Sequence, residues 1–399
     1  MSTHTAPPPR TIGSARRWTM LGVSTAAQAG SAVMISGPAF LIPALQQREG
    51  LTLAQAGLVA AAPMLGVVLS LVFWGLVVDR LGERFVLLAG TGATALIGAT
   101  CTITDDPVTL GLGLLLAGAA ASSTSSASGR VVVGWFPARR RGLAMGIRQM
   151  SQPAGVGIAA VTMAVLALER GVGAALWVPT AAALVTFLAV LVTVVDPPRP
   201  VRTVTATANP YRGDGFLVRV HLVSVLLVVP QFLVWTFALV WLVQDRAWPP
   251  AAAGALVGGA QVAGAAARLV AGWASDRVGT RMQPLRWVSV GATAAMGLLG
   301  LTAGLDAGVS VAFLVLASAF TVADNGLAFT AVAERAGPFW SGRALGTQNT
   351  AQFLAATAVP PVAGLLVAEL GFAAIFALAA LLPLVAIPLV PVAEERPLA

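Results

Sequence analysis

Four ionisable side chains stand inside long apolar runs, namely Arg130, Arg148, Arg268 and Asp324. An arginine at the centre of a membrane-spanning helix costs about 2.5–3.5 kcal/mol, so each needs a partner, a polar cavity or a route to the surface. Arg268 lies eight residues before Asp276, about 12 Å along a helix, too deep for an easy route to the surface. Its guanidinium can bind a planar carboxylate or nitrate through two hydrogen bonds. Two roles stay open for Arg268: contact with such a ligand, or a pair with Asp324 or a backbone carbonyl.

The other two arginines have neighbours that suggest roles. Arg148 shares a polar face with Gln149 and Gln152, and we expect it to act either as a cavity ligand or as a gate residue. The second half of the chain offers Gln348, Asn349 and Gln352 at matching places. Arg130 follows the polar run "SSTSSASG" (122–129), and its position favours a pair with Asp79 over contact with a ligand.

Asp324 lies beside Asn325 and Gly326 in an apolar run. It is a candidate for proton coupling, and a permanent ion pair with Arg268 is the equal alternative. Gln28 and Gln261 could add neutral hydrogen bonds, although packing between helices is the better interpretation for either one alone. A stripe of small and polar residues is expected to face a central cavity, and it comprises Gly258, Gln261, Gly264 with Ala265, Arg268 and Gly272.

The elements that must position these side chains are membrane helices. The 399 residues are 57% hydrophobic and 10% charged, with a mean hydropathy of +0.85, whereas soluble domains are about 25% charged. Windows of about 20 apolar residues predict twelve spanning helices. These fall at 18–46, 53–78, 86–103, 107–135, 143–168, 172–194, 217–243, 250–275, 286–304, 308–333, 344–368 and 371–392.

The 24 basic residues are all arginine, and their distribution along the chain predicts how the chain is oriented in the membrane. Most lie in the segments that are cytoplasmic if the N-terminus is inside, which is the bias expected of an inner-membrane protein. We therefore expect both termini in the cytoplasm and no nucleic-acid partner for the net charge of +8. Cys101 is the single cysteine, so an intrachain disulfide is impossible.

The chain is predicted to consist of two similar halves. We expect a disordered tail at 1–17, a six-helix bundle at 18–195, a cytoplasmic linker at 196–215, a second bundle at 216–393 and a tail at 394–399. "GLVVDRLGER" (75–84) recurs as "GWASDRVGTR" (272–281), and "RGLAMGIRQMSQ" (141–152) recurs as "SGRALGTQNTAQ" (341–352). Such repeats in membrane transport proteins place a ligand site near the midplane, between two bundles that rock about it.

At these residues the sequence resembles the major facilitator superfamily, whose signature after its second helix is G-x-x-x-D-R-x-G-x-R. The matching residues are Gly75, Asp79, Arg80, Gly82 and Arg84 in the first copy, and Gly272, Asp276, Arg277, Gly279 and Arg281 in the second. The resemblance implies an all-α fold of two pseudo-symmetric six-helix bundles, and a gate at this motif that latches an outward-open state. The glycines would allow close approach, the aspartates would pair with arginine or a helix N-terminus, and the arginines would anchor at the inner headgroups.

The resemblance also bears on the ligand. An arginine this far before the motif aspartate in the eighth helix is similar to the anion-binding arginine of oxalate/formate exchangers, nitrate/nitrite porters and monocarboxylate porters. We therefore expect a monomeric secondary transporter of a small anion, with a carboxylate favoured, coupled to protons or to a counter-anion. A proton-coupled multidrug exporter is the alternative. No enzyme activity, cofactor or metal site is expected, since the sequence has no phosphate-binding loop and only two histidines.

Overall fold

The computed structural model describes residues 12–198 and 207–395, and these residues form helices joined by short turns. The predicted tail at 1–17, linker at 196–215 and tail at 394–399 therefore lie partly outside the described residues. The first bundle comprises α1 (Ser14–Ser36), η1 (Gly37–Leu41), α2 (Ile42–Glu49), α3 (Leu53–Leu81), α4 (Glu83–Cys101), α5 (Pro107–Ala121), α6 (Ser123–Trp135), α7 (Ala138–Gln149), α8 (Ser151–Arg170) and α9 (Val172–Thr193).

The second bundle follows a short 3-10 turn, η2 (Pro210–Arg212), in the linker. It comprises α11 (Phe216–Gln244), α12 (Pro250–Val278), α13 (Met282–Gly304), α14 (Ser310–Ala336), α15 (Ser341–Ala379) and α16 (Leu381–Leu389). Several expected spans are built from two pieces, since α5 with α6 and α7 with α8 each continue one another across a break.

Eleven helical stretches among the described residues are long and apolar enough to cross a membrane. The difference from the expected twelve arises at Gly371, where φ is 80° and ψ is 164° inside the otherwise continuous α15. This conformation is accessible to glycine and breaks the helical path. The stretch from Ser341 to Leu389 thus contains two of the expected spans, and the fold is the twelve-helix architecture predicted from the sequence.

The sequence explains the helix ends and the lipid-facing surface. Thr52 and Gln55 form a capping box at the start of α3, and the Asp106 carboxylate accepts the amide hydrogen of Thr109 at the start of α5. The hydrogen bonds from Thr109 hold the pKa of Asp106 below its usual range. Many large apolar side chains remain on the outside, such as Leu58 and Val192, as expected of helices that face lipid.

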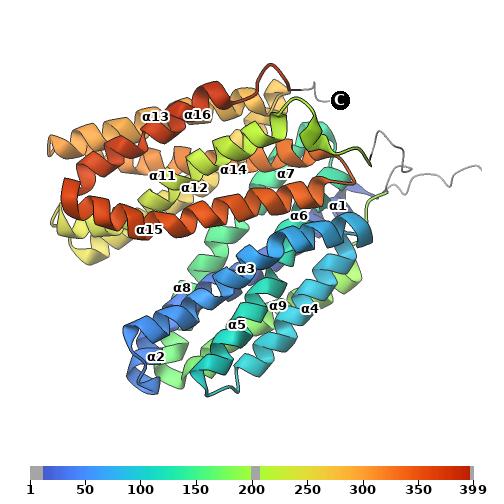
Figure 1. Cartoon of the computed structure of the whole chain (residues 1–399), viewed down its shortest axis with the longest axis horizontal. Helices are drawn as coiled ribbons and strands as arrows, with labels where there is room; N and C mark the ends of the chain where they lie inside the picture. The colour runs from blue at the N-terminus through green and yellow to red at the C-terminus, as the bar shows by residue number, and fades with distance from the viewer. Residues whose placement is uncertain (1–11, 199–206, 396–399) are drawn as a thin grey trace, which may run out of the picture.

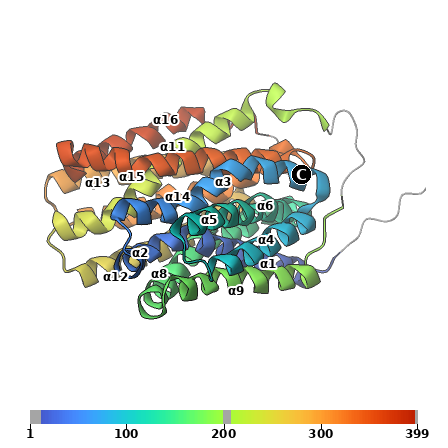
Figure 2. The same ribbon diagram turned by 60° about the horizontal axis from the view of Figure 1, so that its bottom comes forward.

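Figure 1 shows the two bundles as separate groups, α1 to α9 in blue to green and α11 to α16 in yellow to red. They meet at the end that holds the linker and diverge toward the end that holds α2. Figure 2 shows the same helices running side by side along the long axis. At the meeting end α3 packs on α15 and α12 packs on α7.

Glycines bring the bundles together at both of these crossings. A Cβ on Gly75 of α3 would lie 2.4 Å from the carbonyl oxygen of Gly342 on α15. A Cβ on Gly272 of α12 would lie 2.3 Å from the carbonyl oxygen of Gly142 on α7. Because both separations are shorter than any ordinary carbon–oxygen contact, a side chain at either glycine would push the two bundles apart.

Candidate ligand-binding cavity and the latch between the bundles

The two repeated motifs form equivalent contacts where the bundles meet. Asp79 of α3 accepts hydrogen bonds from the backbone N–H groups of Gly342 (2.8 Å) and Arg343 (3.0 Å), which begin α15. Asp276 of α12 accepts from the N–H groups of Gly142 (2.9 Å) and Leu143 (2.8 Å), in the first turn and a half of α7. Each aspartate thus binds the positive end of a helix in the opposite bundle.

Different cations complete the two contacts. In the first, which we call latch 1, Arg130 of α6 lies between Asp79 and Glu83, 2.6 Å from an oxygen of each. Arg343 also donates to Asp79 over 3.0 Å. All three side chains of the Arg130 cluster are at most 4% exposed. Latch 1 is therefore a buried ion-pair network, in which the two carboxylates and the arginine depend on one another.

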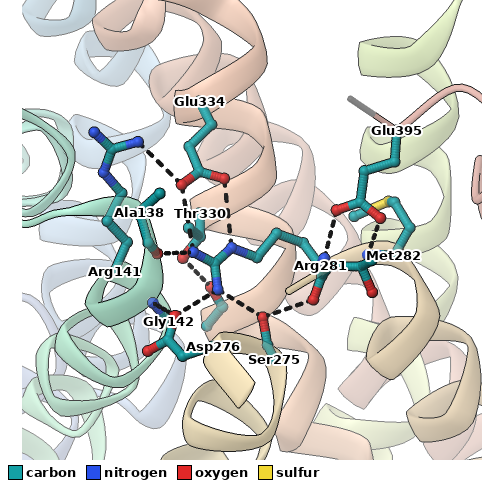
Figure 3. Close-up of polar contacts among 12 residues, drawn as sticks. Ala138, Arg141, Gly142, Ser275, Asp276, Arg281, Met282, Thr330, Glu334 and Glu395 are labelled. Carbon is teal, nitrogen blue, oxygen red and sulfur yellow. Dashed lines mark hydrogen bonds and ion pairs between the residues drawn. The ribbon is translucent and has the colours of Figure 1, made fainter. Parts of the chain in front are cut away.

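The second contact, latch 2, is centred on Arg281 (Figure 3). Its guanidinium donates to Asp276 (2.6 Å), Ser275 (2.7 Å) and the carbonyl oxygen of Ala138 (2.5 Å), and it lies 3.4 Å from Glu334. Arg141 of the first bundle binds the same Glu334 over 3.2 Å. The expectation that Arg281 anchors at the headgroups is wrong, because its side chain is 1% exposed and joins α12, α14 and α7. Arg80 and Arg277 are exposed.

Glu395, near the end of the described chain, adds a contact behind latch 2. Its carboxylate accepts from the backbone N–H groups of Arg281 and Met282 at the start of α13 (Figure 3). Burial raises the pKa of this carboxyl, and the two backbone hydrogen bonds act in the opposite direction. The end of the second bundle is therefore tied to the same arginine that closes the gap between the bundles.

The buried cluster of latch 1 gives a direct stability prediction. Replacing Arg130 with Gln leaves Asp79 and Glu83 as buried carboxylates without their shared cation, which should cost about 3–5 kcal/mol of folding free energy. We expect a marked fall in the melting temperature of the purified protein in detergent. The matched control is Arg139→Gln, at an exposed position in α7, which should change it little. Equal melting temperatures for the two variants would contradict the network.

Further from the linker, the two bundles together line a cavity of about 70 Å³. The first bundle contributes only polar side chains to its wall: Gln28, Ser125, Gln149 and Gln152. The second bundle contributes Val228, Gln231, Phe232, Trp235, Arg268, Asn325, Phe329, Asn349, Gln352 and Phe353. One half of the wall is thus a set of polar groups, and the other half combines a cation with four aromatic rings.

Arg268 is the one charged side chain in this wall, and it is 3% exposed. Its Nε donates to the carbonyl oxygen of Val322 (3.3 Å) and one terminal nitrogen donates to that of Gln149 (3.1 Å). The other terminal nitrogen has no partner among the described residues, and no acidic group lies within 4.0 Å of the guanidinium. Because Gln149 belongs to the opposite bundle, Arg268 both faces the cavity and bridges the two bundles.

Three amides of the wall use their oxygens in hydrogen bonds within the described part of the protein and leave their NH₂ groups free. The side-chain oxygen of Gln28 accepts from Ser128 (2.8 Å), that of Gln149 from Arg148 (2.6 Å), and that of Gln231 from Asn325 (3.0 Å). The NH₂ groups of these three glutamines have no other partner in the described chain. The indole N–H of Trp235 is also unpaired. Asn349 and Gln352 instead use their NH₂ groups within the protein and leave their oxygens free among the described residues. The three free NH₂ groups beside the guanidinium of Arg268 suit a ligand with acceptor oxygens.

Not every predicted site residue lines the cavity. Gln28, Gln149, Gln152, Arg268, Asn325, Asn349 and Gln352 do, whereas Arg148, Gln261 and Gln348 do not. Arg148 lies fully buried behind the wall, where it donates to Ser128, Gln149 and the carbonyl oxygen of Ser125. The stripe on α12 that was expected to face the cavity does so only in part, since Gly264 packs on Ser318 and Val322 of α14.

Asp324 of α14 is 1% exposed, and neither of its carboxylate oxygens has a hydrogen-bond partner among the described residues. It is not within 4.0 Å of the Arg268 guanidinium, so the two do not form a direct ion pair. A carboxyl group buried in this way needs either a proton or a movement that brings a cation to it. Sequence reasoning missed the three phenylalanines of the wall and Gln231, a single amide in the apolar α11.

Paired bundles built from repeated helices, with a polar cavity between them and a latch at one end, are the architecture of secondary transporters. The chain belongs to the major facilitator superfamily, since the family model of that description matches residues 24–358 and 220–398. An uncharacterized MFS-type transporter of Mycobacterium tuberculosis is 42% identical over 383 residues, which cover 95% of this chain and 86% of that protein. A gallate transporter of Pseudomonas putida is 31% identical over 104 residues, 26% of this chain and 23% of that protein.

Solved structures share the fold. The crystal structure of the transporter FucP in its outward conformation superposes with a TM-score of 0.77 at 16% identity, covering 94% of this chain and 99% of FucP. The structure of the human organic anion transporter TETRAN gives a TM-score of 0.73 at 18% identity, covering 95% of this chain and all of that one. At these identities the likeness concerns the fold, and the ligand must be argued from the cavity.

Proposed function

We propose that the protein is a secondary transporter of a small carboxylate, which it moves across the cytoplasmic membrane by alternating access. The observation that carries the proposal is the Arg268 guanidinium in the cavity wall, with one terminal nitrogen unpaired and no acid in contact. A carboxylate would complete its hydrogen bonds and neutralise its charge. The unpaired donors of Gln28, Gln149 and Gln231 would bind further oxygens of the same ligand.

The aromatic half of the wall favours a carboxylate that carries a flat ring. Phe232, Trp235, Phe329 and Phe353 line it, and the Arg268 guanidinium lies 5.9 Å from the centre of the Trp235 ring. Ring stacking and the indole N–H would bind an aromatic acid that bears hydroxyl groups. The partial similarity to a gallate transporter is consistent with this class of ligand.

We further propose that the structure is the outward-facing state. The arginine distribution favours a cytoplasmic position for the linker, and therefore for both latches. With both latches closed, the cavity is separated from the cytoplasm, while the bundles diverge at the opposite end (Figure 1). Transport would require both aspartates to release the helix starts that they bind.

Reconstituted transport tests the proposed function. Liposomes that contain the purified protein would be loaded with one unlabelled acid. Counterflow of labelled benzoate, gallate, lactate and oxalate would then be measured. A lipophilic cation would be assayed in the same way, as the competing class of ligand. Counterflow of at least one carboxylate, and none of the cation, is the expected result. Cation movement without carboxylate movement would instead indicate the multidrug exporter.

Asp324 is the candidate for proton coupling. We expect Asp324→Asn to abolish accumulation of the carboxylate driven by a pH gradient, because the amide cannot exchange a proton, while exchange of one carboxylate for another continues. The measurement compares uptake under an inward proton gradient with counterflow at equal pH. If Asp324→Asn accumulates the carboxylate as the parent does, proton coupling through this residue is wrong, and a counter-anion becomes the favoured partner.

A further inference from the structure

His221 of α11 lies at the centre of a hydrogen-bonded chain that runs from the linker to the cavity. Its Nε2 lies 2.9 Å from the hydroxyl oxygen of Tyr211 in η2, and the two rings stack with centres 5.8 Å apart. Its Nδ1 contacts the side-chain oxygen of Gln348 on α15. The sequence showed only a histidine near a helix start, so nothing in the pattern pointed to these partners.

The chain continues through one hydroxyl into the cavity wall. The NH₂ groups of Gln348 and Gln352 both donate to the Ser224 hydroxyl oxygen, the second over 3.3 Å. Gln352 also donates to the side-chain oxygen of Asn325 over 3.2 Å. Asn325 in turn donates to Gln231 over 3.0 Å. Three amides of the cavity wall, those of Gln352, Asn325 and Gln231, thus receive their orientation from this chain.

The directions of these hydrogen bonds determine which ring nitrogen of His221 carries the proton. A carbonyl oxygen can only accept, so the contact with Gln348 requires a proton on Nδ1 of His221. In a neutral imidazole Nε2 then accepts, and Tyr211 is the donor. If His221 lost the Nδ1 proton, the Gln348 amide would have to turn, and its oxygen would face the Ser224 hydroxyl.

The outer end of the chain reaches latch 1. The Tyr211 ring meets the edge of Trp340, with centres 6.5 Å apart, and the indole N–H of Trp340 donates to the carbonyl oxygen of Thr207 (3.0 Å). The Arg343 guanidinium, which binds Asp79, lies 3.6 Å from the centre of the Trp340 ring. The linker, latch 1 and the cavity amides are therefore in continuous contact.

We propose that His221 is a positioning residue that holds the amides of Gln352, Asn325 and Gln231 in their ligand-binding orientation, and that Tyr211 of the linker holds His221 in its Nδ1-protonated form. This inference rests on the proposed function for the identity of the ligand. The protonation state of the His221 imidazole is independent of the proposed function. The linker between the bundles thus contributes to the ligand site through one buried histidine.

Transport kinetics test the positioning role. His221→Leu removes the donor to Gln348, and Ser224→Ala removes the hydroxyl that both glutamines share. Each should raise the KM for the transported carboxylate by on the order of tenfold, with a much smaller change in kcat, because buried amides lose their fixed orientation. His221→Asn should stay near the parent, since its side-chain NH₂ can replace the Nδ1 donor.

Ser289→Ala is the matched control for Ser224→Ala. Both serines are fully buried in helices of the second bundle, but Ser289 bonds only the carbonyl oxygen of Leu285 in its own helix (3.0 Å). It should leave KM unchanged. If Ser224→Ala and His221→Leu behave like Ser289→Ala, the positioning role is wrong.

Nitrogen-15 NMR of the imidazole supplies a readout that needs no ligand. The chain has two histidines, so a His4→Ala background leaves only His221. We expect a protonated Nδ1 and an unprotonated Nε2, and a shift of the Nε2 resonance on Tyr211→Phe. A protonated Nε2 with a bare Nδ1 would overturn the inference. If no carboxylate is transported, the proposed function fails, and the imidazole spectrum alone decides the assignment of His221.

Discussion

Arg268→Ala should abolish carboxylate transport in liposomes. The substitution removes the one cation in the cavity wall and with it the charge-assisted hydrogen bonds to a carboxylate, which contribute about 1.5–3 kcal/mol each. We expect kcat/KM to fall by on the order of a hundredfold or more. Arg268→Lys keeps the charge but lacks the planar pair of donors, so it should lose roughly tenfold.

The control for this prediction lies on the same helix. Arg277 is exposed near the end of α12, where its guanidinium lies 4.7 Å from the centre of the Trp273 ring, and it does not line the cavity. Arg277→Ala should therefore transport nearly as well as the parent. Transport by a correctly folded Arg268→Ala protein at the parent rate would remove the basis for an anion site.

Loosening both latches should expose the cavity to the cytoplasm. In Asp79→Asn/Asp276→Asn, each carboxylate that binds two backbone N–H groups across the bundles is replaced by an amide with a single acceptor oxygen. Hydrogen bonds to charged groups contribute about 1.5–3 kcal/mol each, so the closed state should lose most of its advantage. Transport should fall strongly, because the protein can no longer return readily to the outward-facing state.

Thiol labelling measures this opening. In a Cys101→Ser background, Ser125→Cys places a thiol in the cavity wall, and a membrane-impermeant reagent is applied to the cytoplasmic face. We expect the double variant to react at least tenfold faster than the protein with intact latches. Asp106→Asn, whose parent carboxylate only caps α5, is the control and should not change the rate. Equal rates in all three proteins would show that the latches do not hold the bundles together.

Much of the architecture could be predicted from the sequence because its signals are local. Apolar windows identify the spans, and the repeated "GLVVDRLGER" motif identifies the crossings where glycine is required. The conformation of Gly371 is harder to predict, since a glycine in an apolar run is also compatible with a straight helix. The predicted spans at 344–368 and 371–392 already divide the chain at this point, and the backbone shows that Gly371 forms the break.

The site was less accessible to sequence reasoning, for two physical reasons. Phe329 and Phe353 line the cavity, but an aromatic ring in a membrane helix can equally face lipid, so composition does not separate the two environments. Arg281 and His221 stand near helix ends, where a polar residue is compatible with either water or burial. Their roles depend on Glu334 and Gln348, partners that lie far away in sequence.

A comparison of two ligands of the same shape tests the central claim most directly. Isothermal titration of the purified protein would measure the binding of a carboxylate that counterflow has identified, beside the neutral amide of the same acid. For benzoate the partner is benzamide. We predict that the carboxylate binds and the amide does not, and that Arg268→Gln loses the difference. Equal binding of the two ligands by the parent, or binding of lipophilic cations in place of the carboxylate, would contradict an anion site at Arg268.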